Sequence, residues 1–145
     1  MVQEALFQLR KGVVKMKKVV FACVHNAGRS QMAAAFFNQL ADPKDAQAVS
    51  AGTQPAEQLH PVVVDAMLES GIDLRQARPQ MLTTELVQGA QILITMGCGD
   101  QCPYVPGMQR EDWPLRDPKG LPIEEVRTIR DEVRERVQQL LRSST

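Results

Sequence analysis

The feature that most constrains the fold is a short apolar run that ends in a cysteine and leads into a polar loop. Residues 17–23 read KKVVFAC, and residues 23–30 read CVHNAGRS. An apolar run of this length, closed by a loop that contains glycine, is typical of a strand buried on both faces of a parallel sheet. Residues 29–41 follow with many helix formers and an apolar face. The sequence therefore predicts a strand, a polar loop and a helix in direct succession.

The rest of the chain continues to alternate between apolar runs and amphipathic segments. We expect further strands at residues 46–52, 91–97 and 111–115. We expect further helices at residues 60–71, 83–90 and 122–144. The fourth strand is placed near a sheet edge because its Pro114 cannot donate to a central ladder. This alternation predicts an α/β fold, in which a single four-stranded parallel sheet is flanked by helices.

The first residues fit this alternation poorly. Met16 directly precedes the first predicted strand, so we expect the domain to occupy residues 16–145. Residues 1–15 are expected to be an N-terminal extension, either an extra helix or a leader, without a catalytic role.

The composition argues against nucleic-acid and membrane partners. The chain has 17 basic and 17 acidic residues and a formal net charge of zero, so no basic field attracts nucleic acid. No apolar stretch approaches the roughly 18 residues of a membrane span. The first residues also lack the features of a signal peptide. We therefore expect a cytoplasmic protein, and because nothing in the sequence demands an oligomer we expect a monomer.

The loop at residues 23–30 has the chemistry of an oxyanion site. In a parallel sheet, ligands bind beyond the carboxyl ends of the strands, and a helix N-terminus directs unpaired N–H groups at them. Ala27 and Gly28 are small, Asn26 tolerates a left-handed conformation, and Arg29 offers a planar fork for two oxygens. We predict that the oxyanion is bound by Val24, His25, Asn26, Ala27, Gly28, Arg29 and Ser30.

Cys23 stands at the start of this loop and is the candidate nucleophile. Positive surroundings favour the thiolate form of a cysteine, and the Ser30 hydroxyl is placed to donate a hydrogen bond to it. The competing interpretation is a buried structural cysteine before an ordinary turn. The strand before the loop and the helix after it favour the functional interpretation.

At this point the residues carry a family resemblance. The stretch VVFACVHNAGRSQMAAAF resembles the signature of the low-molecular-weight protein tyrosine phosphatase superfamily, which includes a branch of arsenate reductases. Residues 49–53 and 60–74 are similar to later family segments, and the resemblance covers about residues 17–142. It implies a flavodoxin-like sheet, with Cys23 as the nucleophile and Arg29 as the anion clamp.

Asp117 and Pro118 resemble the general-acid loop of the same superfamily. Displacement at a tetrahedral oxyanion needs a proton on the leaving oxygen, which a carboxylic acid supplies. The competing interpretation is a solvated turn aspartate, because Asp-Pro-Lys-Gly is favourable turn chemistry. The resemblance implies that Asp117 is the acid and that Asn26 and Ser30 shape the loop.

Two further cysteines favour a reductase over a phosphatase. Cys98 and Cys102 follow the strand at 91–97, on the same sheet edge as Cys23. Reduction of arsenate to arsenite takes two electrons, which a pair of thiols supplies. In the expected relay Cys23 attacks arsenate, Cys98 attacks Cys23, and Cys102 attacks Cys98. The reverse order of Cys98 and Cys102 stays open.

No bound cofactor or metal is expected. The electrons are expected from an external thiol reductant, namely thioredoxin, or mycothiol or glutaredoxin instead, because the spacing of Cys98 and Cys102 is short for the thioredoxin-coupled relatives. Some relatives carry a potassium-binding glutamate where this chain has Ala34, so no such site is expected. Zinc at Cys98 and Cys102 is disfavoured because no second pair of Cys or His residues accompanies them.

Two other functions remain as alternatives. A phosphatase that forms a cysteinyl-phosphate needs only Cys23 among the cysteines. An acid loop whose only aromatic neighbour is Trp113 argues against a phosphotyrosine substrate. A redox sensor or oxyanion-binding regulator without turnover is the third candidate, but such a protein has no need of Asp117.

Overall fold

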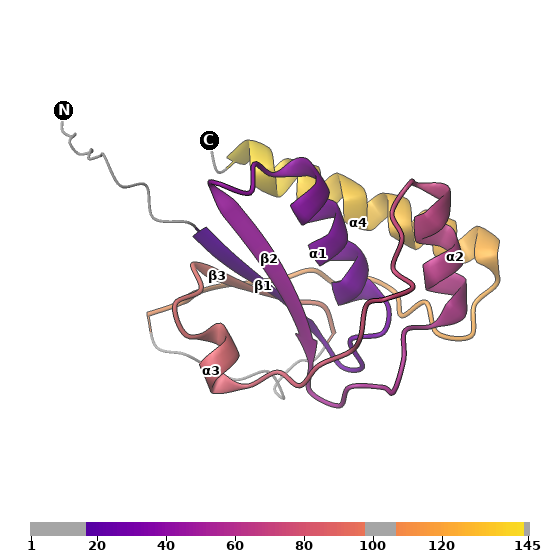
Figure 1. Ribbon diagram of the computed structural model, residues 1–145, viewed down its shortest axis with the longest axis horizontal. Helices are drawn as coiled ribbons and strands as arrows, with labels where there is room; N and C mark the ends of the chain where they lie inside the picture. The colour runs from indigo at the N-terminus through magenta and orange to yellow at the C-terminus, as the bar shows by residue number, and fades with distance from the viewer. Residues whose placement is uncertain (1–16, 98–106, 144–145) are drawn as a thin grey trace.

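The computed structural model describes residues 17–97 and 107–143, which form one sheet with helices on both faces (Figure 1). The predicted extension at residues 1–15 lies outside the described residues, as do Cys98 and Cys102. The strands are β1 (Lys17–Cys23), β2 (Ala46–Gly52), β3 (Ile92–Thr95) and β4 (Gln109–Asp112). The helices are α1 (Arg29–Leu40), α2 (Pro61–Glu69), α3 (Thr84–Val87) and α4 (Ile123–Ser143).

β1 lies inside the sheet, whose order is β2-β1-β3-β4 with every neighbouring pair parallel. This arrangement confirms the predicted α/β fold, and its strand order is that of a flavodoxin-like sheet. β2 lies on one side of β1 and β3 on the other, so the strand order reverses between β1 and β3, which flank the topological switch point. The register pairs Cys23 with Gly52 and Ala22 with Thr95, which brings the carboxyl ends of three strands to one edge.

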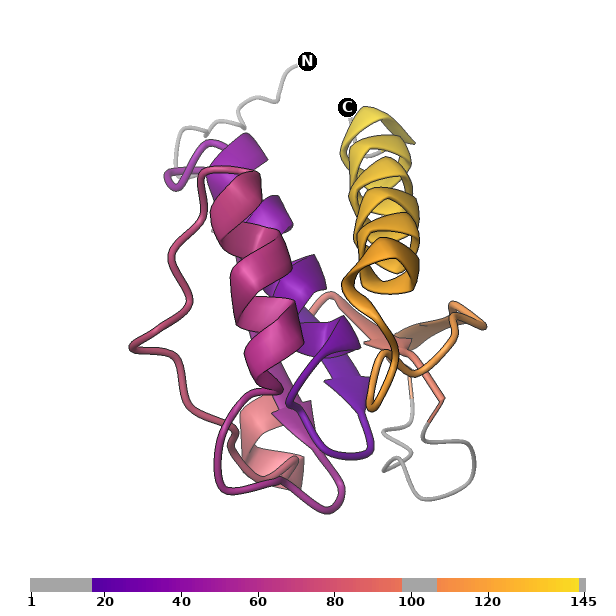
Figure 2. The ribbon, with the colours of Figure 1, turned by 90° about the vertical axis from the view of Figure 1, so that its right-hand side faces the viewer.

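Two apolar layers cover the faces of the sheet. The larger layer packs under α1, α2 and α4 and includes Phe21 and Met67, both fully buried (Figure 2). The smaller layer lies on the other face, where Val20 and Leu93 pack with Val87 of α3. Successive side chains of a strand point to opposite faces, so β1 contributes alternately to both layers. The strand is therefore buried on both faces, as its continuous apolar run predicts.

The fourth strand ends earlier than the sequence predicts. β4 covers Gln109–Asp112 rather than residues 111–115, and its side chains are exposed. Trp113 and Leu115 lie beyond the strand, yet both are buried in the larger apolar layer. The alternation of apolar residues around Pro114 resembles a strand, but a residue without an N–H cannot extend the ladder. The predicted boundary was wrong for this reason.

The third helix is also shorter than the predicted segment at residues 83–90. Its start is confirmed, because the Thr83 hydroxyl accepts a 3.1 Å hydrogen bond from the Leu86 N–H. Gln88 then adopts an extended conformation, and Gly89 has a φ of 79°. A residue with positive φ ends a helix, so only a single turn forms. No helix within the described parts of the chain is long and apolar enough to cross a membrane.

Substitution of Phe21 by alanine should destabilise the fold strongly. The Phe21 ring is fully buried and contacts the rings of Phe37 and Trp113 at centroid distances of 6.2 and 5.5 Å. We expect Phe21→Ala to lower the free energy of unfolding by about 3–5 kcal/mol in a urea titration. Leu68→Ala, at an exposed position of α2, should change it by less than about 0.5 kcal/mol. Equal losses in the two variants would contradict this account of the core.

Candidate active site

The first turn of α1 opens toward the loop at residues 23–30. No side chain within the described residues caps this helix, whose N-cap is Gly28. The first helical hydrogen bond runs from the Met32 N–H to the Gly28 carbonyl, at 3.0 Å. The N–H groups before it have no helical acceptor and carry the positive end of the helix dipole. This turn can therefore donate to an anion, as the sequence predicts.

The carbonyl groups of the same loop are all occupied. Those of residues 23, 24, 25 and 27 accept backbone hydrogen bonds of 2.7–3.2 Å from the segment at residues 53–60. The Asn26 carbonyl accepts from the Gln31 side chain. No backbone N–H of residues 24–28 donates to a described group. With its acceptors turned toward neighbouring segments and its donors left over, the loop has the hydrogen-bonding character of an anion nest.

Cys23 and Ser30 are in direct contact inside this loop. The Cys23 sulfur lies 2.8 Å from the Ser30 oxygen, and both residues are buried. The same serine oxygen accepts a 2.7 Å hydrogen bond from the Asn26 side-chain nitrogen. Because that bond occupies an acceptor position of Ser30, the hydroxyl hydrogen is left to donate to the sulfur. The predicted support of the thiolate by Ser30 thus has the geometry it requires.

Asn26 adopts the left-handed conformation that the sequence predicts for it, with a φ of 52°. Its side-chain oxygen accepts a 2.9 Å hydrogen bond from the Gln80 backbone N–H and a 3.2 Å bond from the Gln31 side chain. Asn26 is fully buried, and these bonds satisfy its amide. Neither glutamine was predicted from the sequence, because Gln31 reads as an ordinary helix former and Gln80 is 54 residues from Asn26.

Arg29 is packed between two other segments at the mouth of the loop. Its guanidinium donates a 3.1 Å hydrogen bond to the Leu115 carbonyl and lies 3.7 Å from the Asp117 carboxylate. On another side it contacts Gly97, where an added Cβ would lie 2.6 Å from a guanidinium nitrogen. Arg29 is 8% exposed, so it is held in place rather than free in solvent. This fixed fork is suited to two oxygens of a tetrahedral anion.

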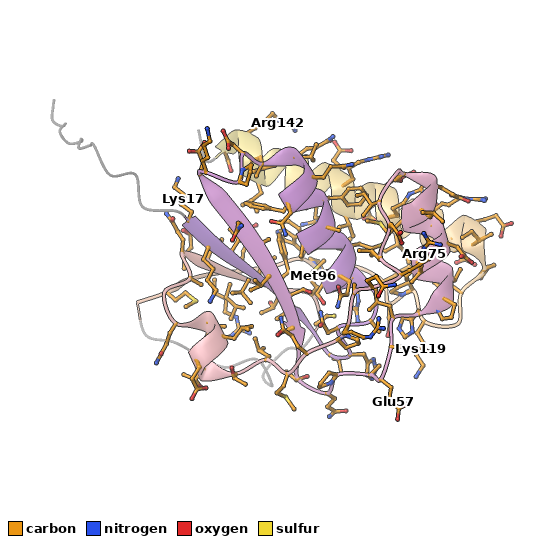
Figure 3. All side chains as sticks on the ribbon, in the orientation of Figure 1. Lys17, Glu57, Arg75, Met96, Lys119 and Arg142 are labelled. Atoms are coloured by element: carbon orange, nitrogen blue, oxygen red, sulfur yellow. The ribbon has the colours of Figure 1, made fainter. Side chains whose placement is uncertain are left out.

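The segment around Asp117 packs directly on the loop at residues 23–30, the anion loop. Its neighbour Pro118 approaches Gly28 so closely that an added Cβ there would lie 2.7 Å from the proline ring. The Asp117 carboxylate accepts a hydrogen bond from the Lys119 N–H, and its side chain is 43% exposed. Figure 3 shows Lys119 at the end of the molecule opposite Lys17, the first residue of β1. Asp117 therefore stands where an acid could reach an anion in the loop, and its catalytic role stays a prediction.

His60 lies behind the same loop. Its N–H donates to the Ala27 carbonyl at 3.0 Å, and its ring lies 3.4 Å from where a Cβ on Gly28 would be. Burial lowers the pKa of the His60 imidazole from its ordinary value of 6.5, although the Asp117 carboxylate opposes that change. His60 is the first residue of the helix predicted at residues 60–71, and in the structure it is the N-cap of α2. The structure adds a contact with the anion loop.

The segment that contains Cys98 and Cys102 lies outside the described residues, so the structure does not place either thiol. The residues directly before it are described. The Met96 N–H donates to the Ala22 carbonyl at 2.7 Å, and Gly97 contacts Arg29. The chain therefore enters the cysteine segment beside the anion loop. Across residues 17–97 and 107–143, no group of three or more His, Cys, Asp or Glu side chains is arranged to hold a metal.

Comparison with known proteins places these features in one family. The family of low molecular weight phosphotyrosine protein phosphatases matches residues 18–144. A glutaredoxin arsenate reductase of Synechocystis sp. is 36% identical over 129 residues, which are 87% of this chain and 97% of the relative. An arsenate reductase of Staphylococcus aureus is 32% identical over 123 residues, 81% of this chain and 91% of the relative. The solved thioredoxin-dependent arsenate reductase of Corynebacterium glutamicum is 37% identical with a TM-score of 0.77, and the match covers 97% of this chain and 68% of that one.

Substitution of Gly97 by alanine should weaken anion binding. Gly97 has a φ of 101°, and its added Cβ would lie 2.6 Å from an Arg29 guanidinium nitrogen, which forces the guanidinium out of its described position. We expect the dissociation constant for phosphate, measured by isothermal titration calorimetry, to rise about tenfold because the fork is lost.

Gly89→Ala is the matched control for this measurement. Gly89 also has a positive φ, of 79°, but nothing lies within 4 Å of its added Cβ. Both variants should lose stability from the backbone strain, and only Gly97→Ala should lose affinity. Unchanged phosphate binding in Gly97→Ala would contradict the described packing of Arg29.

His60 should make the stability depend on pH. Because the pKa of His60 is lowered in the fold, the unfolded chain takes up a proton at this residue more readily than the folded protein does. Its contribution to stability is therefore lost as the pH falls through the ordinary histidine value of 6.5 and toward the lowered pKa of the folded protein. In urea titrations at several pH values, His60→Gln should reduce the loss over this range, and an unaltered pH profile would contradict the prediction.

Proposed function

Because the chain belongs to the low molecular weight phosphotyrosine protein phosphatase family, we propose that it is an arsenate reductase with Cys23 as its nucleophile. The observation that carries the proposal is the loop at residues 23–30, whose carbonyls are occupied and whose N–H groups are left for an anion beside a buried thiol. The relatives named as arsenate reductases support arsenate as that anion. Phosphate and sulfate have the same tetrahedral shape, so we expect both to compete.

In the first step the Cys23 thiolate attacks the arsenic atom of arsenate held in the loop. A sulfur–arsenic bond forms, an arsenic–oxygen bond breaks, and Asp117 donates its proton so that the oxygen leaves as water. Arg29 and the loop N–H groups bind the remaining oxygens, where negative charge develops. The 3.7 Å separation of Arg29 and Asp117 supports this division of roles, because both groups face the same small volume.

In the second step the Cys98 thiolate attacks the Cys23 sulfur. A Cys23–Cys98 disulfide forms, the sulfur–arsenic bond breaks, and its electron pair stays on arsenic, which leaves as arsenite. Ser30 stabilises the sulfur of Cys23 in both steps. The contact of Gly97 with Arg29 supports Cys98 as the attacking thiol, because Cys98 is the next residue along the chain.

In the third step Cys102 attacks the Cys98 sulfur and releases the Cys23 thiolate. The resulting Cys98–Cys102 disulfide is returned to two thiols by an external reductant. A thioredoxin-like protein is our first choice, with glutaredoxin or mycothiol as the other reductants to test. The names of two relatives, one thioredoxin-dependent and one a glutaredoxin arsenate reductase, support an external thiol system. A monomer in the reducing cytoplasm, where thiols stay reduced, completes the proposal.

A phosphatase is the second candidate, because Cys23, Arg29 and Asp117 suffice to form and hydrolyse a cysteinyl-phosphate. The structure weakens the case for a phosphotyrosine substrate. Trp113 is 3% exposed, packs on Phe21 and donates its indole N–H to Glu111, so it is not free to stack on a substrate ring. A regulator without turnover is the third candidate, and a carboxylate beside the anion site favours an enzyme over it.

The proposal is tested by following NADPH oxidation with arsenate, thioredoxin and thioredoxin reductase. The wild type should consume NADPH only when arsenate is present, and Cys23→Ser should be inactive. Cys98→Ser and Cys102→Ser should each lose multiple turnover, by about a hundredfold or more, because the relay is broken. Replacement of the thioredoxin system by glutaredoxin or mycothiol identifies the reductant.

Hydrolysis of an aryl phosphate by the same variants is the control. Cys98→Ser and Cys102→Ser should retain whatever hydrolysis the wild type shows, since that reaction needs no cysteine other than Cys23. Absence of arsenate-dependent NADPH oxidation with every reductant, together with intact hydrolysis in both variants, would overturn the reductase and leave the phosphatase.

A further inference from the structure

Gln31 is a buried polar residue that none of the proposed steps uses. It lies in the first turn of α1 and is 7% exposed. Its side-chain nitrogen is within hydrogen-bonding distance of three oxygens: the Asn26 carbonyl at 3.1 Å, the Asn26 side-chain oxygen at 3.2 Å and the Arg78 carbonyl at 3.2 Å. One amide nitrogen thus ties the anion loop both to the helix and to the segment before β3.

These bonds determine how the Asn26 amide is oriented. Its oxygen faces two donors, the Gln31 side chain and the Gln80 N–H, so its nitrogen is left to face Ser30. If the amide were turned over, its oxygen would face Ser30 and would accept the serine hydrogen. Ser30 would then have no hydrogen to donate to the Cys23 sulfur. The orientation of one buried amide therefore decides whether the nucleophile receives a hydrogen bond.

The left-handed backbone of Asn26 depends on the same contacts. Asparagine tolerates a φ of 52° better than most residues with a side chain, and surrounding bonds hold Asn26 in this conformation. Gln31 bonds to the carbonyl and to the side chain of this one residue, which fixes the backbone and the amide together.

We propose that Gln31 is a positioning residue, which acts through Asn26 and Ser30 to keep the serine hydrogen on the Cys23 sulfur. This inference rests on the proposed role of Cys23 as the nucleophile. The proposed role of Gln31 differs from a merely structural one. A residue that only held the helix to the loop would affect stability without affecting the reactivity of the Cys23 thiol.

The test is the rate at which iodoacetamide alkylates Cys23, followed by mass spectrometry of the Cys23 peptide over a range of pH. Gln31→Met keeps a side chain of similar length and removes both N–H donors. We expect its alkylation at pH 6 to be about three- to tenfold slower than that of the wild type, because a hydrogen bond to the thiolate is lost. The midpoint of the pH profile should move upward by about half a unit or more.

Asn38→Ala is the matched control. The Asn38 amide ties the other end of α1 to β2 through two hydrogen bonds with the Ala48 backbone, of 2.8 and 2.9 Å. This variant should lose stability in a urea titration and leave the alkylation profile of Cys23 unchanged. Loss of stability alone in Gln31→Met, with the wild-type profile, would overturn the inference.

A double-mutant cycle tests the path through Ser30. If Gln31 acts by way of the serine hydroxyl, Gln31→Met should cause no further slowing in a Ser30→Ala background. An equal slowing in both backgrounds would overturn the proposed path. A wild-type Cys23 that alkylates no faster at pH 6 than a small free thiol would overturn the nucleophilic role itself, which distinguishes that failure from failure of the Gln31 inference.

Discussion

The parallel pairing of β1 with both of its neighbours is the constraint on which the rest of this structure depends. Hydrogen bonds to β2 on one side and β3 on the other fix the register, so that Cys23, Gly52 and Thr95 end at one edge of the sheet. The chain segments that leave this edge must then pack against one another. The anion loop, the segment at residues 53–60 and Gly97 meet there for that reason.

Within the described residues, hydrogen bonds occupy the backbone carbonyls of the anion loop and leave the N–H groups of residues 24–28 without an acceptor. Backbone N–H groups of the segment at residues 53–60 donate to the carbonyls of residues 23, 24, 25 and 27, and the Gln31 side chain donates to the carbonyl of Asn26. A buried loop with satisfied carbonyls and spare N–H groups is costly unless a ligand completes it, and an oxyanion supplies the missing acceptors. In its proposed role this loop would serve phosphate and arsenate chemistry equally, because both anions are tetrahedral. What separates a reductase from a phosphatase is the supply of further thiols.

Much of the fold and the centre of the site could be predicted because their signals are local. Cys23, the proposed nucleophile, lies with Asn26, Arg29 and Ser30 within eight consecutive residues, and the alternation of strands and helices indicates a parallel sheet. The fourth strand was misplaced because Trp113 and Leu115 are buried without belonging to it. Periodicity reports which residues are buried, and it does not report whether a backbone ladder continues past a proline.

The sequence by itself determined the order of the elements and the position of the candidate anion loop, since both depend on neighbouring residues. Only the tertiary structure decided that Arg29 meets Asp117, that Pro118 closes on Gly28, and that Gln31 reaches Arg78. These partners are far apart along the chain, and no local pattern records their contact. They meet because strand order and the packing of loops at one sheet edge bring them together, which is a property of the folded chain as a whole.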